Sequence, residues 1–371
     1  MNFLLSRYNI LPLLWSLSVV FLLMVGRIYD ERFTVNGINI VLFINLIPIF
    51  AIFIHAITAR KVAKKVYGYI FVILLLTFYS LILFSIYGYN DFENYSLNKT
   101  VYLVYIFIPI IYFKYAQGLN NNFFLCLYVA CFVFFLFGML KITSSSDRMS
   151  LFGGGPIVFA RWIGIFSILS LYFIKNKIIK LILVLLSFVL MIKAGSKGPF
   201  IFLLISLLFR YLFVLNVKRI FILLFSVTII IYNYLDLIIQ SVGPRLAVLF
   251  SIDILDATSS IGRIDRWRLA IEVFLKNPLG VGLGNFVPVA KSIEPNDFKL
   301  DEYPHNLFLE LFSELGVVGI VISLFVIFKF YKRLQDSKYP LYQKQLLIFL
   351  ILNALVSGDL RDSRFFFLIL L

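Results

Sequence analysis

Long apolar stretches separated by short polar connections make up most of the chain. Eleven of these stretches come near the length that crosses a bilayer as an α-helix, about 20 residues, and a shorter apolar tail follows them. A membrane β-barrel would show short alternating segments instead. The expected spans are 10–26, 38–57, 66–87, 101–113, 123–140, 157–174, 178–192, 199–215, 219–235, 306–328 and 343–358, with a tail over 365–371. We therefore predict an all-α polytopic membrane protein with about 11–12 transmembrane helices.

One long polar segment, residues 236–304, interrupts this pattern between the ninth and tenth predicted helices. Inside it, apolar residues at helical spacing predict an amphipathic helix that Ser259 or Ser260 caps and Pro278 ends. The apolar positions of this helix are Ile264, Trp267, Ala270, Ile271, Phe274 and Leu275.

Composition agrees with a membrane protein, because 61% of the 371 residues are hydrophobic and 14% are charged. Soluble domains contain far more charge. The first apolar stretch lacks a small-residue cleavage site, so we expect a retained helix and not a removed signal. Cys126 and Cys131 lie five residues apart in one apolar stretch. They are expected to be buried thiols, since this spacing suits neither a disulfide nor a metal site.

The net charge of +15 follows the predicted topology. Lysine and arginine gather on alternate connections, which predicts a cytoplasmic N-terminus by the positive-inside rule. Segment 236–304 then forms one large extracytoplasmic loop in a single membrane domain, 1–371. Acids slightly outnumber bases in this loop, so the chain offers no basic surface for nucleic acid. The basic connections contain Arg60, Lys61, Lys64, Lys65, Lys114, Lys175, Lys177, Lys180, Arg210, Lys218, Arg219, Lys329, Lys332, Arg333, Lys338 and Lys344.

Two cations occupy positions where a membrane makes charge costly. Arg161 lies four residues into the sixth apolar stretch, and such residues are often functional. The alternative is that it extends to the nearby interface. Lys197 lies in the short connection before the eighth stretch, where Gly198 and Pro199 open the next helix. It could meet a phosphate there, or belong to an ordinary tight turn.

Two further candidates flank the polar segment. Arg263 falls in the first turn of the predicted amphipathic helix, where free N–H groups favour an anion. The alternative is a solvated arginine on a surface helix. His305 precedes the tenth apolar stretch on the same predicted side, with Asn306 placed to cap that helix and Glu314 on its first turns. Histidine can act as a base near neutral pH, although a lone histidine is more often structural.

The spacing of Gly280, Gly282 and Gly284 is similar to that of a glycine-rich nucleotide-binding loop. No predicted strand precedes them, and the segment is expected outside the cytoplasm, which argues against a nucleotide site. We expect either a tight turn or a turn that lets the backbone approach a ligand.

These features, in this order, resemble the O-antigen ligase and O-antigen polymerase family. Ser196-Lys197-Gly198 resembles a short Ser-Arg-Gly turn of that family. The other residues that carry the resemblance are Gly262-Arg263, Trp267, Asn277 to Gly282, Gly284-Asn285-Phe286, His305-Asn306, Glu314, Gly316 and Gly319.

The resemblance implies transfer of a glycan from undecaprenyl pyrophosphate at the outer face of the bacterial cytoplasmic membrane, without metal or cofactor. Polymerases pass the glycan to another lipid-linked repeat unit, and ligases pass it to lipid A-core. The expected partners are the undecaprenyl-pyrophosphate-linked oligosaccharide and the lipid bilayer, together with chain-length regulator and flippase proteins. A polymerase is favoured, because the compact chain is similar to the divergent polymerases attached to individual sugar clusters.

The resemblance also implies roles for residues. Arg263 and Lys197 would bind the donor pyrophosphate, and His305 would orient or deprotonate the acceptor hydroxyl. Lys197 replaces an arginine common in the family and loses its bidentate geometry, so Arg161 and Arg266 are candidates to share its role. The further substrate-binding candidates are Trp267, Asn306 and Glu314.

Two other classes of function stay open. A transporter of the lipid-linked glycan would place its polar residues near the bilayer midplane, whereas these gather towards one side. A scaffold for an envelope assembly complex would need none of them. Loss of His305 or Arg263 should abolish function in a folded transferase and leave a scaffold intact.

Overall fold

The structure is a computed structural model that describes part of the chain. It describes residues 10–25, 34–35, 38–39, 46, 50, 64–87, 99–101, 103–116, 118–142, 149, 155–212, 258–294 and 303–371. Within these residues the helices are α1 (Ile10–Val25), α3 (Lys64–Tyr87), a π-helix (Leu103–Phe107), α5 (Ile108–Ala116), α6 (Asn121–Lys141), α7 (Gly155–Phe173), α8 (Lys177–Lys193), α9 (Lys197–Leu212), α13 (Thr258–Lys276), α14 (Phe286–Ile293), α15 (Leu307–Gln335), α16 (Leu341–Ser357) and α17 (Arg364–Leu370). The predicted span 219–235 and most of 38–57 lie outside the described residues.

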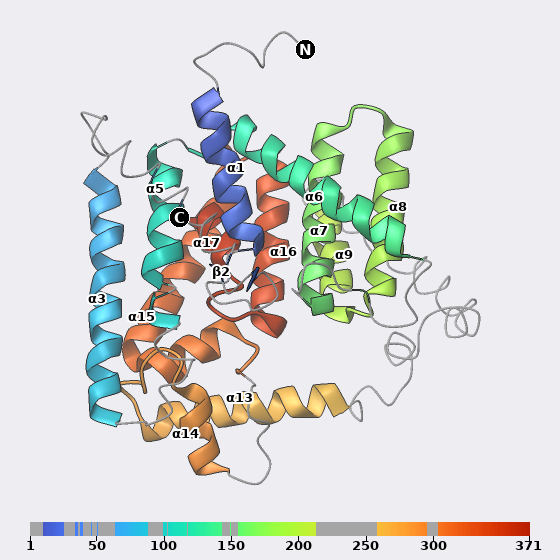
Figure 1. Cartoon of the computed structure of the whole chain (residues 1–371). Coiled ribbons are helices and arrows are strands. Elements are labelled where there is room, and N and C mark those ends of the chain that lie inside the picture. The colour runs from blue at the N-terminus through green and yellow to red at the C-terminus, as the bar shows by residue number, and fades with distance from the viewer. Residues whose placement is uncertain are drawn as a thin grey trace. The chain divides into compact units, whose positions relative to one another are not determined.

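Helices occupy the other predicted apolar stretches (Figure 1). Five helical stretches are long and apolar enough to cross a membrane: Val66–Ile86, Lys99–Ala116, Asn121–Lys141, Gly155–Phe173 and Leu307–Gln335. Shorter apolar helices lie at Pro12–Met24, Lys197–Phe209 and Leu341–Ser357. The protein is therefore built from apolar helices of membrane-spanning type. Its orientation and the side on which each connection lies stay predictions.

The described residues also include one short β-hairpin that the sequence analysis did not predict. Thr34–Val35 (β1) pairs antiparallel with Ile38–Asn39 (β2), with Val35 opposite Ile38. The predicted second span thus begins on a strand. The β-branched residues Thr34, Val35 and Ile38 suit this extended conformation.

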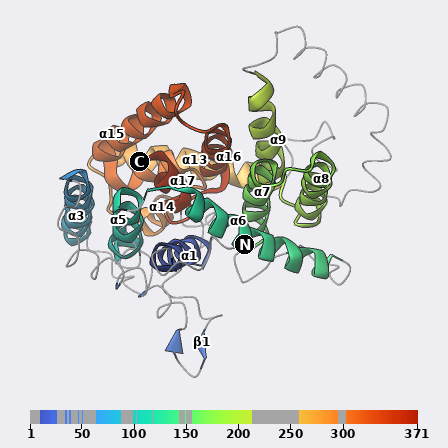
Figure 2. The same cartoon turned by 90° about the horizontal axis from the view of Figure 1, so that it is seen from above.

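The chain divides into two compact units, described separately here. Unit 1 contains residues 1–127, 265–332 and 358–371. Its helices α1, α3 and α5 appear end-on in Figure 2. Trp15 on α1 packs edge-on against Phe113 on α5, with ring centroids 5.7 Å apart. Lys114 donates to the carbonyl oxygen of Leu368 at 2.6 Å, which satisfies a backbone acceptor near the end of α17.

Unit 2 contains residues 128–264 and 333–357, and its helices α7, α8, α9 and α16 pack as a bundle. Gly164 on α7 lies directly against the ring of Phe349 on α16, since a Cβ here would overlap that ring. Ser206 on α9 donates to the carbonyl of Gln345 on α16 at 2.7 Å, and the Gln345 amide donates back to the Ser206 carbonyl at 3.2 Å. Small residues and such hydrogen bonds are typical of helix packing in membranes.

Cys126 and Cys131 are both buried free thiols, as the sequence predicted. Thr258 opens α13, so the proposed cap residues Ser259 and Ser260 fall inside this helix and not before it. Helix boundaries commonly shift by this much. The helix ends at Lys276, before Pro278, as expected.

Candidate active site

The glycine-rich turn after α13 crosses a break in α15. Gly316 has φ 60° and ψ −136°, which interrupts the helix between Glu314 and Val317. The backbone N–H of Gly282 donates to the carbonyl of Glu314 at 2.8 Å, and Val317 N–H donates to the carbonyl of Pro278 at 2.9 Å. The turn therefore supplies the hydrogen-bond partners that the broken helix loses, as a backbone inside an apolar environment requires.

Glycine is needed where these two backbones meet. A Cβ on Gly280 would lie 2.5 Å from the Glu314 carbonyl oxygen, and a Cβ on Gly316 would overlap the backbone of Pro278 and Leu279. Both glycines also have positive φ, which other residues adopt at a cost. The glycines form a tight turn, one of the two sequence interpretations, and the turn backbone lies close to α15.

The same turn also binds to α3. Tyr79 donates its hydroxyl hydrogen to the carbonyl of Leu279 at 2.5 Å, and Leu283 N–H donates to Ser80 Oγ at 2.8 Å. Gly282 lies close to the α3 backbone, because a Cβ there would be 3.2 Å from the Ser80 carbonyl oxygen. The turn is thus fixed between two apolar helices.

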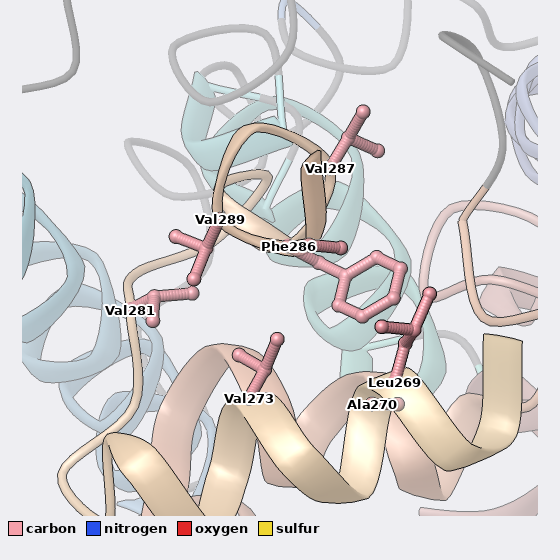
Figure 3. Close-up of a cluster of buried hydrophobic side chains, with 8 residues drawn as sticks. Leu269, Ala270, Val273, Val281, Phe286, Val287 and Val289 are labelled. Carbon is pink, nitrogen blue, oxygen red and sulfur yellow. The ribbon is translucent and has the colours of Figure 1, made fainter. Parts of the chain in front are cut away.

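A buried hydrophobic cluster holds α13 beneath α14 and the turn (Figure 3). Phe286 lies at its centre and points towards Leu269 and Ala270 on α13. Leu309 on α15 packs against this cluster, and Phe312 lies 6.4 Å from Phe274 between ring centroids. The first turns of α15, which His305 directly precedes, are therefore fixed to α13. The cluster consists of Leu269, Ala270, Val273, Val281, Phe286, Val287, Val289 and Ala290.

The predicted apolar face of α13 is only partly the buried one. Ala270 is buried as expected, whereas Ile264, Ile271 and Leu275 are 54%, 48% and 67% exposed. Leu269, a position outside the predicted set, is buried instead. The sequence pattern was misleading because α13 presents apolar residues to two different surroundings.

His305 has a strained backbone at the entrance of α15. Its φ is +56°, and among the described residues no other non-glycine residue has a positive φ. Such a conformation costs roughly 1–3 kcal/mol and is frequent at functional sites. The His305 ring lies 4.2 Å from the ring of Tyr303 between centroids, and its Nδ1 atom is buried. Asn306 Oδ1 accepts from Phe308 N–H at 3.0 Å and from Leu309 N–H at 3.2 Å, which confirms the predicted cap.

Glu314, predicted to bind substrate, belongs to a buried ionic cluster in unit 1. Lys99 Nζ lies 2.7 and 2.6 Å from the two Glu314 carboxylate oxygens and also donates to Glu310. Gly284 N–H donates to the Glu314 carboxylate, and Leu360 N–H donates to Glu310 at 2.8 Å. Lys99, Glu310 and Glu314 are at most 4% exposed. The cluster therefore ties α15 to the glycine turn and to the chain before the π-helix.

Asp359 extends this cluster through the connection between α16 and α17. Burial disfavours its charged form, but nearby Arg361 and Lys99 and the Asp362 N–H favour it more, so the Asp359 pKa falls to about 2. Its carboxylate accepts from Arg361 Nε at 3.0 Å and from Asp362 N–H at 2.6 Å. Asp359 is therefore ionised at neutral pH.

Three of the predicted site residues lie on α13, and they have similar exposure. Arg263, Arg266 and Trp267 are all half-buried. The Trp267 Nε1 atom is buried, and no described residue accepts a hydrogen bond from it. A buried donor of this kind calls for an explanation. The neighbouring exposed Arg268 is ion-paired with Glu294.

The two remaining predicted cations lie in unit 2. Arg161 is 8% exposed on α7, and its guanidinium donates to the carbonyl oxygen of Ser357 at 2.5 Å. A cation at the C-terminal end of α16 is favourable there. Lys197 is half-buried and opens α9, directly after the turn that contains Gly195 and buried Ser196. The connection between α8 and α9 is short, as predicted, but Lys197 is the first residue of α9 and not part of the connection.

Comparison with known proteins places these motifs in a family. Residues 181–324 match the family model described as O-antigen ligase. This segment is therefore of the O-antigen ligase type. No curated protein and no solved structure matches the chain. The matched segment contains Lys197, Arg263 and His305, whereas Arg161 lies before it.

Sequence reasoning missed part of the buried ionic cluster. Lys99 and Asp359 lie outside the matched segment, on either side of it in the chain. The available signal was a lysine at the start of an apolar stretch, together with two glutamates four residues apart on one helix face. Their pairing depends on contacts between residues more than 200 positions apart.

Proposed function

We propose that this protein is a membrane glycosyltransferase that polymerises undecaprenyl-pyrophosphate-linked repeat units at the outer face of the bacterial cytoplasmic membrane. The observation that carries the proposal is the family match over residues 181–324. It spans the strained His305 at the α15 entrance, which the Asn306 cap and the glycine turn hold in place. Strain at a titratable residue that surrounding contacts fix is typical of an active site.

The chemistry is a direct displacement at the anomeric carbon. The acceptor hydroxyl oxygen forms the new glycosidic bond, the bond from the anomeric carbon to the pyrophosphate oxygen breaks, and the lipid pyrophosphate leaves with the bonding electrons. His305 receives the hydroxyl proton. Arg263 and Lys197 neutralise the leaving pyrophosphate, in roles that rest on their motifs. These side chains supply the acid–base and anion-binding functions, and we propose that the reaction needs no metal.

An apolar cavity in unit 1 supports a lipid-linked donor. Its volume is about 340 Å³, and its walls come from α3, the π-helix, α5, α15 and the C-terminal segment. Leu311 and Leu315 line it and directly follow Glu310 and Glu314 on α15. An isoprenoid chain is apolar and suits such walls.

The contacts refine the roles of the other candidates. Trp267 has a buried indole N–H available to a sugar oxygen, and Arg266 lies beside it on α13, so both stay proposed substrate-binding residues. Asn306 caps α15, Glu314 binds Lys99 and Arg161 binds Ser357. We propose that these three position the site and do not bind the glycan.

A ligase is the second candidate, because the matched family is described as O-antigen ligase. The two reactions share the donor and differ in the acceptor alcohol. The geometry of His305 suits either one.

The test is deletion of the protein in its host and complementation with wild type, His305→Ala, Arg263→Ala and the control Arg268→Ala. Arg268 is an exposed arginine on the same helix as Arg263. Membrane levels of each variant are checked, and surface polysaccharide is separated on a gel. A polymerase predicts that the first two variants reduce the ladder to single attached repeat units, while Arg268→Ala restores it.

Other patterns have defined meanings. Carrier-linked polymer that accumulates without attached glycan would establish the ligase. Normal ladders from His305→Ala and Arg263→Ala at normal protein levels would overturn the site. Repeat units retained on the cytoplasmic side would point to a transporter instead.

A further inference from the structure

One side of α13 and its following turn expose large apolar side chains. Ile271 and Leu275, one helical turn apart, are 48% and 67% exposed, and Leu279 in the turn is 64% exposed. We call these three residues the exposed stripe. The opposite side of α13 is already buried in the hydrophobic cluster under Phe286. About half or more of each of these side chains is therefore left outside the packing of unit 1.

The depth of the turn on α3 indicates what surrounds the stripe. Ser80, which binds Leu283, lies six residues before Ile86, the end of the apolar span Val66–Ile86. At 1.5 Å per residue this is about 9 Å along the helix axis. Tyr79, which binds Leu279, lies one residue deeper, and helical side chains tilt further towards the N-terminus. The turn is therefore attached to α3 within its apolar length.

The stripe adjoins α3 through Leu279, and α3 already exposes apolar side chains of lipid-facing character. Beside Tyr79 and Ser80, the outer side of α3 exposes Phe78 at 62%, Ile82 at 43% and Ile86 at 67%. In a membrane-spanning helix such residues face lipid. Figure 1 shows that α13 runs across the direction of α3. A helix that lies in the plane of the membrane interface has this orientation relative to a membrane-spanning helix.

The charged side chains nearest to the stripe are paired with one another. Lys276 pairs with Glu272 at 2.9 Å, and Arg268 pairs with Glu294. These pairs lie on the polar side of α13 and neutralise each other. α13 also carries Arg263 and Arg266, and an apolar stripe beside a polar side rich in arginine and lysine fits the boundary between hydrocarbon and headgroups.

We propose that the exposed stripe inserts into the lipid bilayer at the end of α3, so that α13 is anchored half-submerged at the membrane interface. The inserted stripe fixes the height of Trp267 and Arg266 relative to the headgroups. This inference rests on the membrane-spanning character of α3 and is independent of the proposed reaction.

The test uses the full-length protein in phosphatidylcholine vesicles, with Cys126 and Cys131 replaced by alanine. Leu275→Cys and, as a matched control, Glu272→Cys each receive an environment-sensitive fluorophore. Quenching is compared between a nitroxide attached to the lipid chain and iodide in water. We expect the label at position 275 to be quenched several-fold more by the lipid nitroxide than the label at 272, and the label at 272 more by iodide.

Two results would overturn the proposal. Strong iodide quenching at both positions would place the stripe in water. Little quenching by either agent at position 275 would show that another protein surface covers it. Ile271→Cys provides a second reporter if Leu275→Cys elutes as aggregate on size exclusion, and the same expectation applies to it.

Discussion

The two compact units of this protein differ in the interactions that stabilise each of them internally. In unit 2, α7, α9 and α16 meet through side chains, as in the contact of Gly164 with the Phe349 ring and the reciprocal hydrogen bonds of Ser206 and Gln345. In unit 1, two backbones cross at Gly280 and Gly316, and a buried ionic cluster surrounds Lys99. Unit 2 resembles an ordinary membrane bundle in which buried Arg161 binds a backbone carbonyl, whereas unit 1 contains irregular backbone and a buried cluster of charges of both signs.

This difference shows that costly local geometry is concentrated in unit 1. Irregular backbone and buried ions are costly in an apolar environment unless each group finds a partner. Unit 1 supplies those partners with the turn 277–284 and the connection 358–363, and the strained His305 lies at the start of the same broken helix. We therefore expect changes in unit 1 to be more damaging than equivalent changes in unit 2.

The largest effect should come from Lys99→Met. This change leaves Glu310 and Glu314 without their cation, and breaking a buried ion pair from one side costs about 3–5 kcal/mol. The yield of monodisperse protein and its unfolding temperature in detergent should both fall sharply. Arg161→Met in unit 2, which removes a hydrogen bond to a carbonyl and leaves no carboxylate unpaired, should be milder.

A compensating variant separates lost charge balance from lost volume. Lys99→Met combined with Glu310→Gln and Glu314→Gln should recover part of the yield, because no carboxylate is then left unpaired. An unfolding temperature of Lys99→Met equal to that of wild type would contradict the importance of the cluster.

A smaller but still large effect is expected from Gly316→Ala. The new Cβ meets rigid backbone at Pro278 and must adopt positive φ, so a loss of about 3 kcal/mol or more in the free energy of unfolding is expected. The matched variant Gly164→Ala meets the Phe349 ring, which can shift, and should cost about 1–3 kcal/mol. Thermal unfolding of both variants in the same detergent gives the comparison. A greater loss from Gly164→Ala would reverse it.

A moderate, pH-dependent effect should follow Asp359→Asn. The Asp359 pKa is lowered to about 2 in the fold, against about 3.9 in an unfolded chain. Its carboxylate therefore stabilises the fold fully above pH 4, and this contribution fades as pH falls towards 2. The difference in unfolding temperature between wild type and Asp359→Asn should be constant from pH 7 to 5 and shrink below 4. A difference that grew on acidification would have the wrong sign.

The smallest effect should come from Ser206→Ala in unit 2. It removes one hydrogen bond to the Gln345 carbonyl, and such a bond contributes about 1 kcal/mol. The unfolding temperature should fall slightly, with no change in yield. A loss as large as that of Lys99→Met would mean that the two units do not differ as described.

Sequence patterns were sufficient for the helices and insufficient for their interruptions. Continuous apolar runs predicted α3, α6, α7 and α8 closely, because burial in lipid requires such runs. The break at Gly316 escaped, since an isolated glycine is tolerated inside a helix and only the opposing turn makes it necessary. The burial of Leu269 in place of Ile271 escaped because periodicity cannot tell a protein neighbour from lipid.

For the candidate site, the sequence predicted local interactions better than interactions between residues far apart in the chain. The Asn306 cap is local and was predicted correctly. The partner of Glu314 was not predicted, because Lys99 lies 215 residues away and no periodic pattern connects them. Trp267 was proposed from its motif, and its buried indole N–H is information that only the fold provides.

The most direct measurement is the rate of glycan transfer by purified wild type and His305→Ala in vesicles. The substrate is the lipid-linked repeat unit extracted from cells that lack this protein, and the product is the polymer ladder. We predict that His305→Ala keeps the unfolding temperature of wild type and forms polymer roughly 10²–10⁴-fold more slowly, the usual effect of losing a general base. An undiminished rate in the folded variant would contradict the central claim that His305 carries the chemistry.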